Sequence, residues 1–162
     1  MKKLIYIFVL AGVLSCGTHK NVGSTQKAVT QCKECTVEVL HNKNITILGD
    51  ANTGTYYNIT DDTQKTVIKY IYGQNTNTPY QDSGYTETLL LTLPNELSEG
   101  TFKNKELSKL NAALDVQCYC KGKAGVYKIN EGVVSLVDKV VTVTIPSVVD
   151  NQKLTSFSFQ LK

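Results

Sequence analysis

An alternation of apolar and polar residues dominates the sequence from Cys32 to its end, and it constrains the fold more than any other feature. Three segments show it most clearly: Leu89, Leu91 and Leu93; Val141, Val143 and Ile145; and Phe157, Phe159 and Leu161. The positions between these apolar residues are mostly Thr, Ser or Gln. Because successive side chains of a strand point to opposite faces, the pattern predicts half-buried antiparallel strands, each with one apolar face.

Shorter segments of the same kind bring the expected number of strands to about ten. They are residues 36–40, 45–48, 55–59, 66–72, 116–121, 125–129 and 133–137. Turn-forming residues separate them, at Gly49-Asp50, Asp61-Asp62, Asn130-Glu131-Gly132, Asp138-Lys139 and Asp150-Asn151. We therefore expect residues 32–162 to form a single all-β domain, an antiparallel sandwich or barrel.

One segment departs from the alternation. Leu107, Leu110 and Leu114 are spaced as on one face of a helix, and Asn104 in front of them is a residue type that caps helix N-termini. This spacing predicts one short helix near residues 105–114.

The N-terminus carries a different pattern. Lys2 and Lys3 precede an apolar run over residues 4–14, which is too short to span a membrane, and the small Ser15 stands before Cys16. Together with Val13, this order of features resembles the lipobox signal peptides of bacterial lipoproteins. The resemblance implies that residues 1–15 are removed and that Cys16 is diacylated and usually acylated on its new amine. Two or three acyl chains anchor a protein stably in a membrane.

The residues that follow Cys16 indicate where the anchor lies. Residues 17–31 contain no aromatic side chain and no sustained period, so we expect residues 16–31 to be the lipidated cysteine and a flexible tether. Gly17 replaces the Asp that retains enterobacterial lipoproteins in the inner membrane. By this resemblance the protein is expected in the outer membrane, on its periplasmic face or on the cell surface.

The charge of the chain excludes one class of partner. All 17 basic residues are Lys, against 14 acidic residues, for a formal charge of +3. Removal of Lys2 and Lys3 with the signal peptide lowers it to +1 (3 − 2). A nearly neutral domain without Arg has no electrostatic basis for binding nucleic acid. We expect the membrane as a partner, through the lipid anchor.

Four cysteines remain once Cys16 is lipidated: Cys32, Cys35, Cys118 and Cys120. An exported domain is expected to form disulfides. In a regular strand, residues i and i+2 lie roughly 6–7 Å apart, whereas a bridge needs Cβ atoms within about 4 Å. We therefore expect two disulfides between the CxxC and CxC clusters, with the pairing open. The alternatives are a zinc site made by the four thiolates and free, redox-active thiols. No other cofactor is indicated.

Few residues suggest catalysis. His19 lies in the expected tether, and His41 has no accompanying GxSxG motif. Four acidic residues could supply the carboxylates of a glycan hydrolase, although their neighbours are typical of turns: Asp61, Asp62, Glu96 and Glu99. We assign no catalytic residue and expect a non-catalytic binding or structural module of the cell envelope, with the hydrolase as the alternative.

Tyrosines supply a weak indication of binding. Six of the nine lie between residues 56 and 85, beside a polar run over residues 74–79. Tyrosine rings with neighbouring amides and hydroxyls suit a glycan or an envelope protein. The candidates are Tyr70, Tyr72, Tyr80 and Tyr85. The alternative is ordinary cross-strand packing of Tyr70 and Tyr72.

Overall fold

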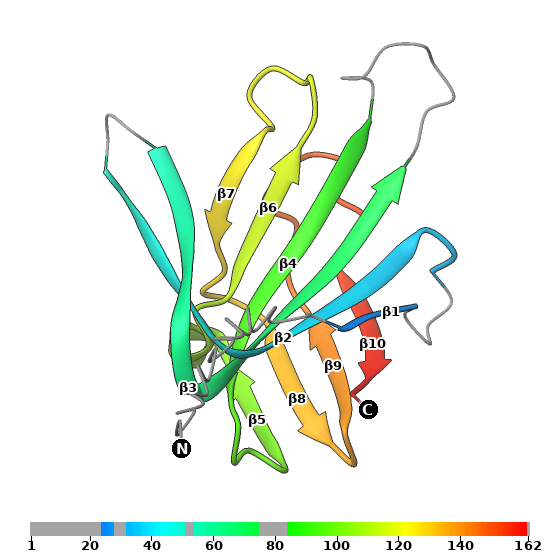
Figure 1. Cartoon of the computed structure of the whole chain (residues 1–162). Coiled ribbons are helices and arrows are strands. Elements are labelled where there is room, and N and C mark those ends of the chain that lie inside the picture. Colours follow the sequence, from blue (N-terminus) through cyan, green and yellow to red (C-terminus); the bar gives the residue numbers. More distant parts are fainter. Residues whose placement is uncertain (1–23, 28–31, 51–53, 75–83, 162) are drawn as a thin grey trace, which may run out of the picture.

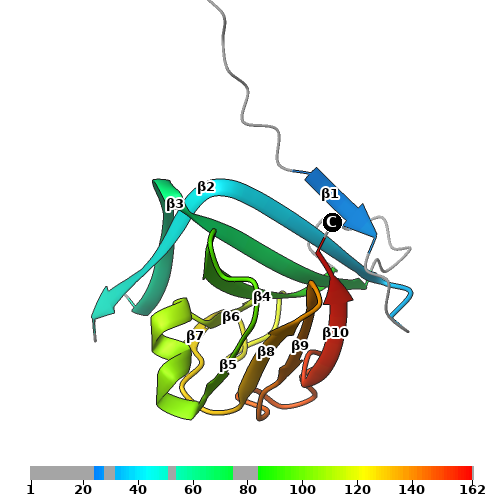
Figure 2. The same cartoon turned by 90° about the horizontal axis from the view of Figure 1, so that it is seen from below.

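Two antiparallel β-sheets face each other in the computed structural model, which describes residues 24–27, 32–50, 54–74 and 84–161 (Figures 1 and 2). The larger sheet contains β1 (Ser24–Lys27), β2 (Cys35–Asp50), β3 (Gly54–Gln74), β4 (Tyr85–Pro94), β6 (Ala113–Gln117) and β7 (Gly125–Lys128), paired in that order. The smaller sheet contains β10 (Ser156–Gln160), β9 (Val140–Thr144), β8 (Val133–Val137) and β5 (Gly100–Lys103), paired in that order. The expected all-β antiparallel sandwich is confirmed.

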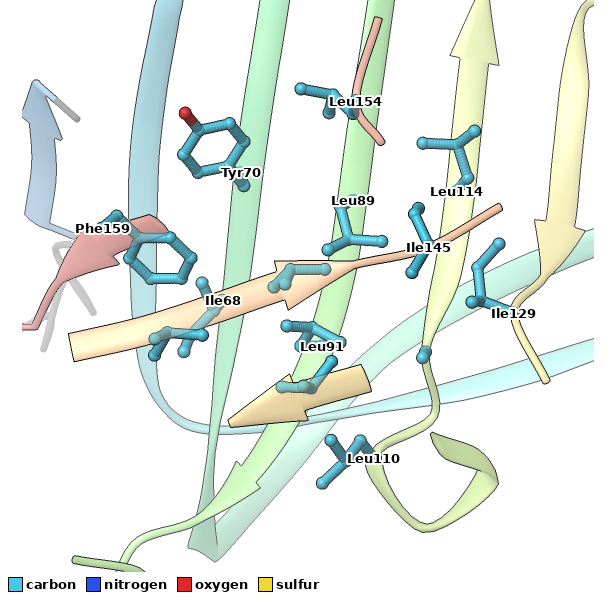
Figure 3. Packing of buried hydrophobic residues seen from close by; sticks show 14 of the residues in the cluster. Ile68, Tyr70, Leu89, Leu91, Leu110, Leu114, Ile129, Ile145, Leu154 and Phe159 are labelled. Carbon is cyan, nitrogen blue, oxygen red and sulfur yellow. The ribbon is translucent and has the colours of Figure 1, made fainter. Parts of the chain in front are cut away.

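The inward faces of both sheets form the main core. The alternating residues predicted from the sequence fill it, together with Leu107 and Leu110 from the segment after β5. Figure 3 shows Leu110 among its neighbours. Its largest fully buried side chains include Ile68, Tyr70, Leu89, Leu91, Leu107, Leu110, Leu114, Ile129 and Phe159. Because these residues come from both sheets, the core holds the two layers together.

The second and third strands are longer than the sequence suggests. Four of the expected short strands merge into β2 and β3, which run for 16 and 21 residues. The pairing slips at the middle of this hairpin: His41 pairs with Thr66, but Lys43 pairs with Asp61. Asn42, at φ +57°, therefore stands opposite four residues of β3. Such an irregularity bends a strand pair, and the two strands arch over the sheet (Figure 2).

The expected turn at Asp61-Asp62 is consequently wrong. Asp62 Oδ1 does accept a hydrogen bond from the Gln64 backbone N–H at 3.0 Å, which is typical turn chemistry. This turn produces the bulge inside β3 and not a reversal of the chain. We call the outer part of the hairpin, residues 43–50 and 54–61, the hairpin arm.

The hairpin arm covers the outer face of the larger sheet. Ile45 of the arm is fully buried with Val67, Leu90 and Ala113, and these four residues make a second, smaller core. Strand β4 is therefore buried on both faces. The prediction that this strand has one apolar face and one solvated face is wrong, because the arm packs on the face that was expected to contact solvent.

The expected helix is shorter than the leucine spacing suggests. A 3₁₀ helix, η1, spans Asn104–Leu110 and buries Leu107 and Leu110. It ends at Asn111, whose backbone is left-handed at φ +46°. Leu114 lies in β6, where it pairs with Leu89, so its place in the helical spacing was misleading. In the described part of the chain, no helix is long and apolar enough to cross a bilayer.

Three of the predicted turns are confirmed, and the one at Asp150-Asn151 has Asn151 at φ +62°. Asp138 and Lys139 both have positive φ and connect β8 to β9 as a two-residue hairpin turn. The Asn130-Glu131-Gly132 segment connects β7 to β8, and a Cβ on Gly132 would collide with the Thr144 carbonyl oxygen. The Asp138-Lys139 turn fixes the register of β8 and β9. The segment at 130–132 instead leads the chain from the larger sheet to the smaller one.

Part of the expected tether is a strand. Ser24–Lys27 form β1 and pair antiparallel with β2, from Ser24 opposite Val39 to Lys27 opposite Thr36. For these four residues the prediction of a flexible tether is wrong, because their backbone extends the edge of the larger sheet.

Candidate functional site

A half-open pocket of about 250 Å³ lies between the two sheets, at the end where β2 and β3 bend. Its apolar lining comes from both layers: Val39, Ile68, Leu93, Pro94, Leu97, Leu136 and Leu161. The alternation of the strands explains this lining, because Val39, Ile68 and Leu93 are inward positions of the larger sheet. The described lining contains no Asp, Glu or Lys. The pocket therefore suits an uncharged, apolar ligand group.

The three polar side chains in the lining form one hydrogen-bonded chain. His41 Nδ1 lies 3.3 Å from Thr66 Oγ1, and Thr66 Oγ1 donates to Asn95 Oδ1 at 2.7 Å. Asn95 Nδ2 in turn donates to the Thr63 carbonyl at 2.9 Å. Because the Thr66 hydroxyl has one hydrogen, which Asn95 receives, we infer that the neutral His41 ring carries its hydrogen on Nδ1.

These hydrogen bonds link His41 through Thr66 and Asn95 to the bulge of β3. Asn95 fastens the loop after β4 to the bulge of β3, through the Thr63 carbonyl and its own backbone N–H to Gln64 at 2.8 Å. No carboxylate takes part in this chain of hydrogen bonds. It is therefore not the acid–histidine–nucleophile arrangement of a hydrolase.

The three tyrosine candidates that the structure describes do not form one exposed binding surface. Tyr70 is only 1% exposed and stacks on Phe157 in the main core, with ring centroids 4.0 Å apart. Tyr72 and Tyr85 are half-buried and meet edge to face at 6.5 Å. Tyr80 lies outside the described residues. The proposed role of Tyr70 in ligand binding is wrong, because the inward alternation of β3 places its ring between the sheets.

A buried carboxylate that the sequence analysis overlooked lies beside Tyr85. Glu87 has no exposed surface, and its oxygens accept hydrogen bonds from the backbone N–H groups of Lys153 and Leu154, both at 2.7 Å. The Tyr85 hydroxyl also donates to Glu87 Oε1, at 2.6 Å. Burial and this hydrogen bond raise the pKa of Tyr85 well above its ordinary value. We call residues 150–155 the 150s segment. Glu87 holds this segment against the larger sheet through its hydrogen bonds to Lys153 and Leu154.

One signal in the sequence could have found Glu87. It stands two residues before Leu89, so the alternation of β4 already assigns it to the inward face. A carboxylate at an apolar position needs hydrogen-bond donors close by. Here they are backbone N–H groups more than sixty residues away, which no local pattern reveals.

The cysteines pair within their clusters, and the expectation of bridges between clusters is wrong. Cys32 is bonded to Cys35, and Cys118 to Cys120. Strand β6 ends at Gln117, so Cys118 and Cys120 lie in a bend and not in the regular strand on which the prediction relied. The residue between them, Tyr119, is 94% exposed.

The order of the strands explains why bridges between clusters do not form. Cys35 pairs with Tyr72, Tyr72 with Glu87, and Glu87 with Val116, so the two clusters stand three strand spacings apart. Three spacings amount to about 14 Å, far beyond the reach of a disulfide. The same separation prevents the four sulfurs from forming one zinc site.

The remaining acidic candidates are dispersed or paired with lysine. Asp61 forms an ion pair with Lys43, and Asp62 Oδ2 lies 3.4 Å from Lys65 Nζ. Glu96 and Glu99 are exposed in the loop between β4 and β5. In the described ranges, no three His, Cys, Asp or Glu side chains are grouped so that they could hold a metal ion. None of these four carboxylates lines the described pocket between the sheets.

Comparison of the chain with protein-family models, with curated proteins and with solved structures finds no match. The pocket, the paired cysteines and the N-terminal pattern therefore carry the functional argument by themselves.

Proposed function

We propose that this protein is a lipid-anchored lipoprotein of the bacterial outer membrane, and that its β-sandwich is a non-catalytic binding module. The observation that carries the proposal is the uncharged pocket between the sheets. One of its lining residues, Val39, pairs with Ser24 of β1, the first described strand after Cys16. The binding site therefore lies at the side of the domain from which the chain leads back to its proposed anchor.

Two further observations support this proposal. The four cysteines of the described domain are all bonded in pairs, which is typical of proteins in oxidising compartments outside the cytosol. In the described lining, the histidine contacts a threonine hydroxyl that donates its hydrogen to an amide oxygen, and no carboxylate lines the pocket, so binding suits the geometry better than hydrolysis does.

The lipid anchor is tested by replacing Cys16. In a bacterial host that processes lipoproteins, Cys16→Ser should leave the precursor uncut and without acyl chains, and should release it from membranes washed with salt. Thr18→Ser, two residues further on, should behave as the wild type and is the matched control. Membrane fractionation and intact-protein mass measure the outcome. Retention of the Cys16→Ser variant in the washed membranes would contradict the proposal.

A further inference from the structure

The pocket and the start of the described chain lie side by side. Ser24, the first residue of β1, pairs with Val39, and Val39 lines the pocket together with His41, two residues further along β2. Strand β1 runs from there toward Thr36, away from the pocket. The chain before Ser24 therefore reaches the sandwich at the pocket end of the sheet edge.

The length of chain before Ser24 keeps Cys16 close to this pocket. Eight residue steps separate Cys16 from Ser24. Fully extended, they span at most about 26–29 Å. A group attached to Cys16 thus stays within a few nanometres of Val39, and such tethering corresponds to an effective concentration on the order of millimolar. At that concentration a contact with a millimolar dissociation constant is about half occupied.

The chemistry of the lining matches a hydrocarbon chain. Aliphatic side chains of both sheets surround the space, and the described lining carries no charge. The volume of about 250 Å³ is many times the ~10–15 Å³ that a cavity needs to hold one water molecule. The pocket therefore has room for a segment of one acyl chain.

We propose that the pocket binds part of one of the acyl chains carried by the protein's own Cys16. This inference rests on the proposed function, because it requires that Cys16 is lipidated. Two acyl chains that stay in the bilayer still anchor the protein stably. Withdrawal of the third chain brings the pocket end of the sandwich down to the membrane surface and shortens the span between domain and bilayer.

A photocrosslinking experiment tests this occupancy. Cells that express the full chain are supplied with a fatty acid bearing a diazirine in its alkyl chain, which the host incorporates into the lipids of Cys16. Washed membranes are irradiated, and the crosslinked peptides are mapped by mass spectrometry. We expect crosslinks from the acyl group to the segments around Leu93–Leu97 and Leu136 of the same molecule. Crosslinks confined to bilayer lipid would overturn the inference.

Two pairs of variants make the test specific. Leu136→Trp fills the pocket, whereas Val137→Trp changes its 50%-exposed neighbour on the same strand. Leu97→Glu places a charge in the lining, whereas Ser98→Glu places it on the adjacent exposed residue. In each pair the pocket variant should reduce the crosslinks into the pocket at least fivefold, and the neighbour should leave them unchanged. Equal crosslinking within both pairs would refute acyl binding.

Incorporation of the labelled fatty acid at Cys16 distinguishes failure of the lipoprotein proposal from failure of the acyl-binding proposal. If Cys16 incorporates no labelled acyl chain, the lipoprotein proposal itself fails. If Cys16 is labelled but its chains crosslink only to bilayer lipid, the protein is a lipoprotein whose pocket does not hold its own anchor. Leu97→Glu lies in a partly exposed loop and is the variant to rely on if Leu136→Trp does not fold.

Discussion

The main sandwich core and the core under the hairpin arm share strands β2, β3, β4 and β6 but differ in how they are closed. The main core lies between two sheets and takes residues from both layers, including the segment after β5. The core under the arm contains four fully buried residues, and the arm that covers it is a continuation of β2 and β3 of the same sheet. Two sheets that pack face to face enclose the main core. A single hairpin that folds back over its own sheet encloses the core under the arm.

Two hydrogen bonds add to the few apolar contacts that hold the arm on the sheet. The Ile45 backbone N–H donates to Thr92 Oγ1 at 3.3 Å, and the Tyr57 hydroxyl donates to Asp115 Oδ2, also at 3.3 Å. Hydrogen bonds are directional, so these contacts fix where the arm lies, whereas apolar burial supplies the attraction. The comparison indicates that the arm is the less stable region and can open while the sandwich stays folded.

The largest expected effect is in the main core. Leu89→Ala should lower the free energy of unfolding by about 2–5 kcal/mol, because it leaves a cavity among side chains held on both sides. Leu89 is only 1% exposed. Urea unfolding followed by circular dichroism measures the change. Val137→Ala, at an exposed site, should stay within about 0.5 kcal/mol of the wild type. If Leu89→Ala also changed the free energy of unfolding by no more than about 0.5 kcal/mol, the two sheets would not be packed as described.

The matching change under the arm is Ile45→Ala. Ile45 is fully buried, but its partners can follow the movement of a single hairpin, so we expect about 2 kcal/mol, the lower end of the range for such truncations. Hydrogen exchange should show faster exchange of the arm amides and unchanged protection in β4 and β9. The exposed neighbour Thr46 supplies the control, Thr46→Ala. Equal loss of protection in both regions would show that arm and sandwich unfold as one unit.

The same contrast explains which parts of the fold could be predicted from the sequence. The period of two identified the strands of the main core, because each has one apolar face and the inward positions carry Leu, Val, Ile and Phe. The period of two could not predict that both faces of β4 are buried. Leu90 was the available signal, an apolar residue on the face that was otherwise hydroxyl. A single apolar residue on a solvated face is too common to indicate a covering element.

The candidate site was harder to predict than the fold. Its lining comes from three strands of one sheet, one of the other, the loop after β4 and the C-terminal segment, so only the sheet order brings them together. The cysteine prediction failed for the same reason. It assumed that Cys118 and Cys120 lie in a regular strand and that the clusters lie on adjacent strands, and β3 and β4 in fact stand between them.

The disulfides sharpen the comparison because neither of them joins the arm to the sandwich. Each closes a very short loop, with sequence separations of 3 and 2. The chain-entropy treatment gives about 1.5–2 kcal/mol for such a loop, against about 4–5 kcal/mol for a loop of more than 80 residues. The double variant Cys118→Ser/Cys120→Ser should therefore lose less than about 2 kcal/mol. Peptide mapping without reduction should find both local pairs, and a peptide joining Cys35 to Cys118 would contradict the structure.

The smallest expected effect compares one tyrosine from each region. Burial, followed by the charge of Asp115, raises the pKa of Tyr57 in the arm. Burial, followed by the hydrogen bond to Glu87, raises the pKa of Tyr85 in the sandwich. A phenol whose pKa is higher in the folded state binds its proton more tightly there. The stability it contributes is complete below pH 10, the ordinary pKa of the phenol, and is lost as the pH rises above that value.

Tyr57→Phe and Tyr85→Phe test this contrast. Each should cost about 1 kcal/mol at neutral pH, from the lost hydrogen bond. Each should also flatten the fall in unfolding free energy above about pH 10, measured by urea unfolding at a series of pH values. With Tyr57→Phe, the flattening should come with faster exchange of the arm amides alone, whereas Tyr85→Phe should affect β4 and the 150s segment. Tyr56→Phe, at the 45%-exposed neighbouring position, is the control and should change neither quantity. If Tyr57→Phe loosened the 150s segment as much as the arm, the two regions would not be independently stable.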